Sequence, residues 1–598
     1  MRGSSVTLRH ALLLALFAAS VRALALWDDG DSLLYQVGGL DAPQYLDMAR
    51  RFTTGAWPDE KPFFWAPGYS VFLGLLMRIS ESITWLKAVQ VALGAASCVL
   101  IGALASRVFQ DARVTVLSAA IAVLYGPLVY YDLQISPASL DVFLHLLLLV
   151  LLLEARSRER FWLWCAAGIV AAASAVTRGA VLLLLPVVIA WLLWPPPRID
   201  GRTLRSHAAR LAALLAPLCL VLVLVHHHNV GADRAWGGKT HAAKSSAQEA
   251  GATSGMLLSY NLGINFLLGN VAERHAVNRV EHPLCLLEYK MLVFKPTLAG
   301  AVKPSAQSSF LMAEALDWMR AHPREWLQLL GVKALELVQG EEISRDTSID
   351  ASGTDNRVLA ALIWKHGIAF PSGLLIPLAL LGIALSPKRS RQQALLLGAL
   401  AVQAVFVLAF FVTTRYRLAL WVSAIPYAAY VLVATADAVR TWPRERARLL
   451  TMMALGAIAI AVSNHGLSPE PTTYAAFEHG HLGALLEKQA KHDEAVGHWR
   501  TALSIDPHYA QAHFQLANYE TKREDLAAAA AHYDAGLEAA PTTFAARIAY
   551  AGVLIKQARM SEATDQLRRV LKEVSSYRVH MTVCMMAKRS KLDLRPYC

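Results

Sequence analysis

The chain has 598 residues, of which 55% are hydrophobic and 17% charged. Its mean hydropathy of +0.37 excludes an ordinary soluble protein and predicts a polytopic membrane protein. The net charge of +12 would suit a nucleic-acid-binding protein, but the arginines lie in short loops between apolar segments. Orientation in a membrane explains such arginines better, so we expect no nucleic-acid partner.

The first 26 residues combine Arg2 and Arg9 with an apolar run that begins at Ala11. A cleaved signal peptide has this pattern, but Arg22 interrupts the run and further apolar segments follow. We therefore expect a retained first helix with its N-terminus in the cytoplasm. Residues 27–86 then form a first periplasmic loop with two interfacial helices, one after Asp41 and one over residues 70–79.

Ten more apolar segments follow, each close to the roughly 17–20 residues that a membrane span needs once its flanks are included. They cover residues 88–104, 114–129, 140–153, 161–176, 180–194, 211–225, 371–385, 394–412, 418–434 and 449–462. The sequence thus predicts about eleven transmembrane helices. Arginines cluster in alternate loops on the side of Arg2 and Arg9, as the positive-inside rule requires.

The predicted orientation makes residues 226–370 a large periplasmic loop domain, helical over 308–339 and beginning with a loop at 231–253. An odd number of spans places the C-terminus in the periplasm as well. The weak step is segment 449–462, which has only fourteen residues. If it did not cross the membrane, the C-terminal region would be cytoplasmic.

The C-terminal region repeats itself with a period of 34 residues. Four positions show it, where Ala495, Trp499, Ala502 and Pro507 recur as Ala529, Tyr533, Gly536 and Pro541. A 34-residue period with small residues at helix contacts is typical of tetratricopeptide repeats. We expect this all-α module over residues 474–572 and a tail over 573–598. Such repeats usually bind a protein partner, and a structural lid on the membrane domain is the alternative.

Asp41, Tyr45 and Ala49 follow the first apolar segment at intervals of four residues, so on a short helix they share one face. Other stretches of interest are Ala66-Pro67-Gly68-Tyr69, Val89 to Gly94, Thr177-Arg178, Asn261 to Asn270 and Arg415-Tyr416-Arg417-Leu418. Together they resemble bacterial GT-C type glycosyltransferases of the family 39 kind, within the protein mannosyltransferase and aminoarabinose transferase superfamily. The last two stretches are similar to the subgroup with tetratricopeptide tails.

The resemblance implies that residues 1–466 form a GT-C-like transmembrane glycosyltransferase domain in the bacterial inner membrane. It implies transfer of a hexose or pentose from a polyprenyl-phosphate-linked donor to a hydroxyl of a lipid, glycan or protein at the periplasmic face. Asp41 takes the place of the catalytic base, and a single displacement with one base inverts the anomeric centre. Many relatives have Asp-Glu here, whereas Ala42 follows Asp41. Whether Asp47 supplies a second carboxylate, and whether a divalent metal is a cofactor, stays open.

The chemistry of such a transfer needs a base for the acceptor hydroxyl and cations for the leaving phosphate, both at the membrane–water boundary. Arg178, Arg415 and Arg417 lie at outward helix ends, against the positive-inside bias, and their guanidinium forks suit a phosphate. The alternative is contact with membrane lipid headgroups. Further candidates for the lining of the site are Tyr45, Asp47, Lys61, Tyr69 and Asn265, although Asn265 could instead belong to helix caps.

Two other classes of protein compete with the enzyme. A non-enzymatic scaffold would recruit partners through its repeats and would not need Asp41. A transporter is disfavoured because His145 is the one ionisable residue central to a predicted span and the span pattern shows no internal duplication.

Overall fold

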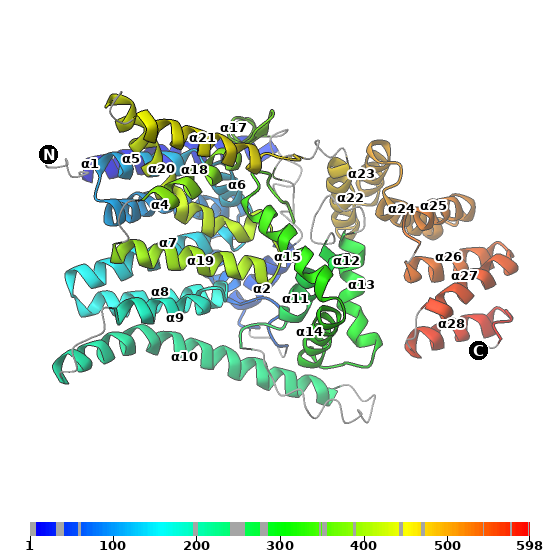
Figure 1. The fold of residues 1–598 in the computed structure, drawn as a ribbon. Helices are drawn as coiled ribbons and strands as arrows, with labels where there is room; N and C mark the ends of the chain where they lie inside the picture. The colour runs from blue at the N-terminus through cyan, green and yellow to red at the C-terminus, as the bar shows by residue number, and fades with distance from the viewer. Residues whose placement is uncertain are drawn as a thin grey trace. The chain divides into compact units, whose positions relative to one another are not determined.

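The computed structural model describes most of the chain, and the described part is mainly helical (Figure 1). The described residues are 8–31, 41–57, 61–194, 201–239, 257–275, 285–345, 349, 356–386, 390–441, 446–467, 473–541, 543–573, 577–595 and 597. Over these ranges the strands are a single antiparallel pair, β1 (Trp364–Lys365) and β2 (Ala369–Phe370). The expected all-α class is confirmed.

The chain forms two compact units. Unit 1 consists of Met1–Lys239, Ser254–Ala272 and Trp318–Pro469, and unit 2 of Thr240–Thr253, Glu273–Asp317 and Glu470–Cys598. Part of the predicted periplasmic loop domain thus belongs to the same unit as the C-terminal repeats. The helices α11 (Leu262–Asn270) and α15 (Pro323–Val338) lie in unit 1, and α13 (Cys285–Leu298) lies in unit 2. The helix α14 (Pro304–Ala321) extends from unit 2 into unit 1.

Six described helices are long and apolar enough to cross a membrane, so the chain is a polytopic membrane protein. They are α1 (Leu8–Asp28), α4 (Ile83–Phe109), α7 (Ala138–Arg158), α10 (Gly201–Lys239), α19 (Arg391–Ala409) and α20 (Thr414–Arg440). A seventh span is possible in α5 (Ala112–Val123) and α6 (Gly126–Leu133), which meet at a bend of 49°.

The other predicted spans are shorter helices in the structure. They are α8 (Phe161–Thr177), α9 (Val181–Leu192), α18 (Ser372–Leu385) and α21 (Arg446–Ser463). All eleven predicted segments therefore correspond to a helix or to the α5–α6 pair, and these helices run roughly alongside one another in Figure 1. One boundary was wrong, because α10 continues to Lys239 where a loop was expected from Gly231. Residues 240–253 of that loop lie outside the described residues.

The two ends of this bundle differ in their polar contacts. At one end, Arg113 pairs with Asp437 at 2.7 Å and Arg391 donates to the carbonyl of Trp191 at 2.8 Å. The first contact joins the start of α5 to the end of α20, and the second joins the start of α19 to the end of α9. At the other end lie the start of α7, the end of α8 and the start of α20. Successive helices thus run in alternating directions.

The helix α21 ends at the second of these ends. Asn464, directly after α21, donates to the carbonyl of Gly373 at 2.9 Å, and Ser463 donates to the carbonyl of Val338 at 2.9 Å. The C-terminal region therefore leaves unit 1 at the end where α18 and α20 begin.

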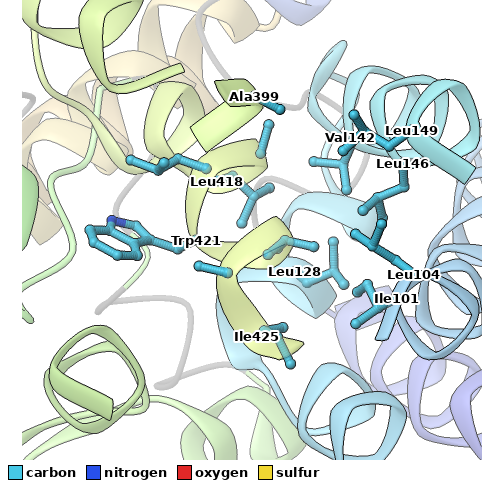
Figure 2. Close-up of a cluster of buried hydrophobic side chains, with 14 of the residues drawn as sticks. Ile101, Leu104, Leu128, Val142, Leu146, Leu149, Ala399, Leu418, Trp421 and Ile425 are labelled. Atoms are coloured by element: carbon cyan, nitrogen blue, oxygen red, sulfur yellow. The ribbon is translucent and has the colours of Figure 1, made fainter. Parts of the chain in front are cut away.

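The core of unit 1 forms where α20 and α7 meet their neighbours (Figure 2). Leu418 and Ile425 of α20 lie in one cluster with Leu128 of α6 and Leu146 of α7. The ring of Trp421 points to the other side of α20, where its Nε1 atom donates to the carbonyl of Leu337 at 3.1 Å. Small residues bring the backbones together, as is usual in membrane bundles. A Cβ atom on Gly382, for example, would lie 2.1 Å from the carbonyl oxygen of Tyr427.

An ion pair lies inside this bundle, contrary to the expectation that His145 is the one ionisable group central to a span. Arg22 of α1 donates to Asp132 of α6 at 2.7 Å, and both side chains are fully buried. Ser139 donates to the second oxygen of Asp132 at 2.7 Å. The pairing explains how an arginine can interrupt the first apolar segment.

Unit 2 contains helix pairs that follow the 34-residue period. They are α22 (Thr473–Lys488) with α23 (His492–Ile505), α24 (Ala510–Lys522) with α25 (Leu526–Ala539), and α26 (Phe544–Lys556) with α27 (Met560–Glu573). Ala490, Glu524 and Ala558 have left-handed backbones at the same place in each pair, with φ of 60°, 64° and 59°. The next amide closes each turn in Schellman fashion, as Lys491 does onto Leu486 at 3.0 Å.

The small residues of the repeat lie where helices touch, as the sequence predicts. A Cβ atom on Gly536 would lie 2.5 Å from the ring of Phe514, and Ala529 is fully buried. The predicted tail is not a loose extension, because it forms α28 (Tyr577–Arg589) and buries Val583 and Ala587 in the same core.

Histidine pairs also recur at this period, and they predict a pH dependence. The Nδ1 atoms of His479 and His498 lie 2.8 Å apart, and those of His513 and His532 lie 3.0 Å apart. In the third repeat Arg547 donates to Gln566 at 2.7 Å instead. Burial lowers the pKa of His498 although Glu494 opposes the shift, and burial, His513 and Arg500 lower the pKa of His532.

Because the folded-state pKa is depressed, the unfolded repeats bind protons first as the pH falls below about 6.5. We expect the repeats to lose stability as the pH falls through this window and to be most stable above it. Hydrogen exchange of peptides from α24 and α25 in the full-length protein, corrected for the intrinsic rate, should be faster at pH 5 than at pH 7.5. The double variant His513→Arg/His532→Gln, which copies the third repeat, should reduce the difference. Equal exchange at both pH values in the wild type would contradict this.

Candidate functional site

The helix α2 (Ala42–Thr53) places Asp41 at the rim of unit 1. Asp41 is the N-cap residue, and Pro43 in the first turn favours a helix start here. Tyr45, Leu46 and Ala49 are buried, and the ring of Tyr45 meets that of Tyr69 edge-on at 5.1 Å. This packing on α3 (Gly68–Met77) fixes α2, while the side chain of Asp41 keeps 24% of its surface exposed.

The carboxylate of Asp41 meets the guanidinium of Arg415. The Nη1 atom of Arg415 lies 3.2 Å from Oδ2 of Asp41, although 374 residues separate them in the chain. Arg415 belongs to the first turn of α20, and its side chain is only 6% exposed. The structure therefore brings the predicted base and one predicted phosphate ligand into direct contact.

Arg178, the C-cap residue of α8, joins the same group. Its Nη1 atom donates to Oδ2 of Asp141 at 2.8 Å and to the backbone carbonyl of Arg415 at 3.2 Å. The guanidinium carbons of Arg178 and Arg415 lie 4.6 Å and 5.4 Å from the centroid of the Tyr416 ring. Such cation–π contacts orient both guanidinium groups.

A third arginine lies next to this group. The guanidinium carbon of Arg345 lies 4.4 Å from the centroid of the Phe411 ring, and this ring packs edge-on against Tyr416 at 5.2 Å. The site group thus consists of Asp41, Asp141, Arg178, Arg345, Arg415 and Tyr416.

Sequence reasoning missed Asp141, Arg345 and the contacts of Tyr416. For Asp141 a signal was available, because an aspartate within the apolar segment 140–153 is costly unless it has a partner. The pairing of Asp141 with Arg178 supplies that partner. Arg345 lies in a loop, where no local pattern distinguishes it from a solvated charge.

Arg417, predicted as a ligand of the donor phosphate, does not join the site group. Its side chain is 2% exposed and donates to the backbone carbonyls of Glu336 at 2.9 Å and Gln339 at 2.7 Å. The reason is geometric, since residues two apart on a helix point about 200° away from each other. Arg415 faces α2, and Arg417 faces the loop after α15.

The other predicted lining residues are spread over several places. Asp47 pairs with Arg51 at 2.8 Å on the exposed side of α2, so it does not stand beside Asp41 as a second carboxylate. Lys61 lies 5.1 Å from the ring centroid of Trp236 on α10. Tyr69 is fully buried and donates to Gln90 at 2.5 Å. Asn265 belongs to α11, where its backbone N–H donates to the backbone carbonyl of Asn261.

The site group has a mixed electrostatic character. Two carboxylates and three guanidinium groups converge at one end of the bundle. Asp41 is the most exposed member of the two ion pairs, Arg178–Asp141 and Arg415–Asp41. Such a group can accept a proton at Asp41 and can bind an anion through the arginines. Among the described residues, no three His, Cys, Asp or Glu side chains are placed to hold a metal ion.

A search against models of known protein families found no match to this chain, and neither did a search of curated proteins. What the fold and the site define is therefore a class, namely an all-α polytopic membrane protein with a carboxylate–arginine group at one end of its helix bundle.

Proposed function

We propose that the protein is a GT-C type glycosyltransferase that transfers a sugar from a polyprenyl-phosphate donor to a hydroxyl acceptor. The observation that carries the proposal is the convergence of Asp41, Arg178 and Arg415 from three distant segments, with ion-pair distances of 2.8 Å and 3.2 Å. A carboxylate and arginines that meet at a membrane helix end supply the two functions that this reaction needs.

The proposed reaction is a single displacement. The acceptor oxygen attacks the anomeric carbon and loses its proton to the carboxylate of Asp41. The bond between the anomeric carbon and the phosphate oxygen breaks, and the polyprenyl phosphate leaves with the electron pair. Arg178 and Arg415 bind this phosphate and stabilise its growing charge. One displacement inverts the anomeric configuration, and no second carboxylate is needed as a nucleophile.

The ion pair between Asp41 and Arg415 fits this scheme as a resting state. The phosphodiester of the donor carries one negative charge, as Asp41 does, but it can bind Arg178 and Arg415 together and so competes for the guanidinium of Arg415. Binding of the donor would then release Asp41 toward the acceptor. A substitution of Asp41 or of Arg415 is therefore expected to affect both donor binding and proton transfer.

We further propose that the protein spans the bacterial inner membrane eleven times and that the site faces the periplasm, with unit 2 carrying tetratricopeptide repeats on the same side. The alternating helix directions and the end of α21 beside α18 support this arrangement. A fluorescent reporter that folds only in the cytoplasm should stay dark when fused after Cys598, and alkaline phosphatase should be active there. A bright reporter would place the C-terminus in the cytoplasm instead.

The test of the function is an assay of the purified protein with a panel of polyprenyl-phosphate-linked sugars. Arg178→Gln and Arg415→Gln should each lower kcat/KM by about 10- to 100-fold, since a hydrogen bond to a charged group contributes about 1.5–3 kcal/mol. Arg51→Gln is the matched control, because Arg51 pairs with Asp47 on the exposed side of α2. Failure of the wild type to transfer any sugar would refute the proposal.

A further inference from the structure

The side chain of Arg417 lies among backbone carbonyls at the end of α15. Its Nη1 atom donates to Glu336 and Gln339, and its Nη2 atom donates to the carbonyl of Glu341. Nη2 also lies 3.2 Å from Oε2 of Glu342. A cation that satisfies the last carbonyls of a helix is favourable. Arg417 thus ties the end of α15 to the first turns of α20.

Glu342 makes the complementary set of contacts. Its Oε2 atom accepts a hydrogen bond from the hydroxyl of Thr414 at 2.7 Å, and its Oε1 atom accepts one from the hydroxyl of Ser372 at the start of α18. The backbone adds two bonds, because Ile343 donates to the Thr414 hydroxyl at 2.8 Å and Thr414 donates to the Ile343 carbonyl at 3.0 Å. We call Glu342, Thr414 and Arg417 the clamp.

The clamp sets the rotation of α20 at its first turn. Thr414 and Arg417 are three residues apart and share the face that meets the loop after α15. Arg415 and Tyr416, between them, must then point to other sides, where Arg415 meets Asp41 and Tyr416 lies under Arg178. Arg345 follows Glu342 by three residues, so the same contacts restrain the loop that carries it.

We propose that Glu342 and Arg417 are positioning residues, which hold Arg415 and Tyr416 in the orientation that binds the lipid phosphate. This inference rests on the proposed function but concerns residues that touch neither substrate. Neutralising Glu342 removes the counter-charge of the buried Arg417, and the first turn of α20 loosens. A displacement of about 1 Å at a binding group can cost about 100-fold in activity.

The test compares Glu342→Gln with Glu341→Gln in the full-length protein. Glu341 is the neighbouring buried acid, and its carboxylate pairs with Lys365 at 2.9 Å. Hydrogen exchange of peptides that span residues 411–421 reports on the clamp without any lipid. Binding of unglycosylated polyprenyl phosphate, measured per folded molecule, reports on the consequence for the site.

For Glu342→Gln we expect faster exchange over residues 411–421 and lipid binding that is weaker by about 10- to 100-fold. Glu341→Gln should stay within about twofold of the wild type in binding. Unchanged hydrogen exchange in Glu342→Gln would show that Glu342 does not hold the first turn of α20. Faster exchange with unchanged lipid binding would overturn the positioning role. If the wild type binds no polyprenyl phosphate, the proposed function fails, while the exchange data still decide whether the clamp holds α20.

Discussion

Asp41→Asn should reduce sugar transfer by about 10²- to 10⁴-fold, the range that a general base contributes. Asparagine has the same shape as aspartate but cannot take the proton of the acceptor hydroxyl at neutral pH. The fold should survive, because Asp41 makes no side-chain hydrogen bond to the N-terminus of α2 and is partly exposed. The measurement is the rate of transfer by equal amounts of purified wild-type and variant protein.

Asp47→Asn is the matched control for this experiment. It makes the same chemical change six residues further along, where the carboxylate pairs with Arg51 and both side chains are exposed. Such surface pairs contribute about 0.3–0.5 kcal/mol, so both stability and transfer should stay close to the wild type. Undiminished transfer in Asp41→Asn would remove the mechanism.

A scaffold would show the opposite pattern. It would tolerate Asp41→Asn and lose its function when residues 474–572 are deleted. The pair of variants therefore separates the enzyme from the non-enzymatic alternative.

The helices of this protein could be predicted from sequence because their signals are local. A long apolar run by itself indicates a helix in the membrane, so segment 161–176 predicts α8 within one residue. The repeat period is equally local, and Ala490, Glu524 and Ala558 adopt the same backbone in each copy. Hydropathy could not locate the C-terminal end of α10, because its last turns are polar but still helical.

The site could be predicted only in part, because its contacts join distant segments. Asp41 and Arg178 were found by their position at outward helix ends. Arg415 and Arg417 have the same local environment in the sequence, yet Arg415 contacts Asp41 and Arg417 contacts Glu342. The difference depends on how α20 is rotated against α15, and no local pattern contains that rotation.

Buried charges were the hardest feature to predict, and Arg22 is the clearest case. An arginine in an apolar segment signals either a helix end or a partner elsewhere. The partner, Asp132, lies 110 residues away at the end of a bent helix pair. Only the packed bundle shows that the two meet.

Arg22→Leu should therefore destabilise unit 1 by about 3–5 kcal/mol. The substitution leaves the carboxylate of Asp132 inside the bundle without its cation. Ser139 would still donate to one oxygen, but one neutral hydrogen bond does not replace an ion pair at 2.7 Å. The carboxylate packs directly against α4, since a Cβ atom on Gly94 would lie 1.8 Å from Oδ2 of Asp132. The midpoint of thermal unfolding in detergent and the yield of folded protein should both fall.

The double variant Arg22→Met/Asp132→Leu separates the loss of the pair from the burial of an unpaired charge. Replacing a buried ion pair by apolar groups of similar volume is often neutral or stabilising, whereas removal of one partner is costly. The double variant should therefore recover most of the stability that Arg22→Leu loses, with Asp132→Leu alone as unstable as the single arginine variant. If Arg22→Leu unfolds at the wild-type temperature, the carboxylate is already neutral or solvated in the bundle, and the ion pair does not stabilise this fold.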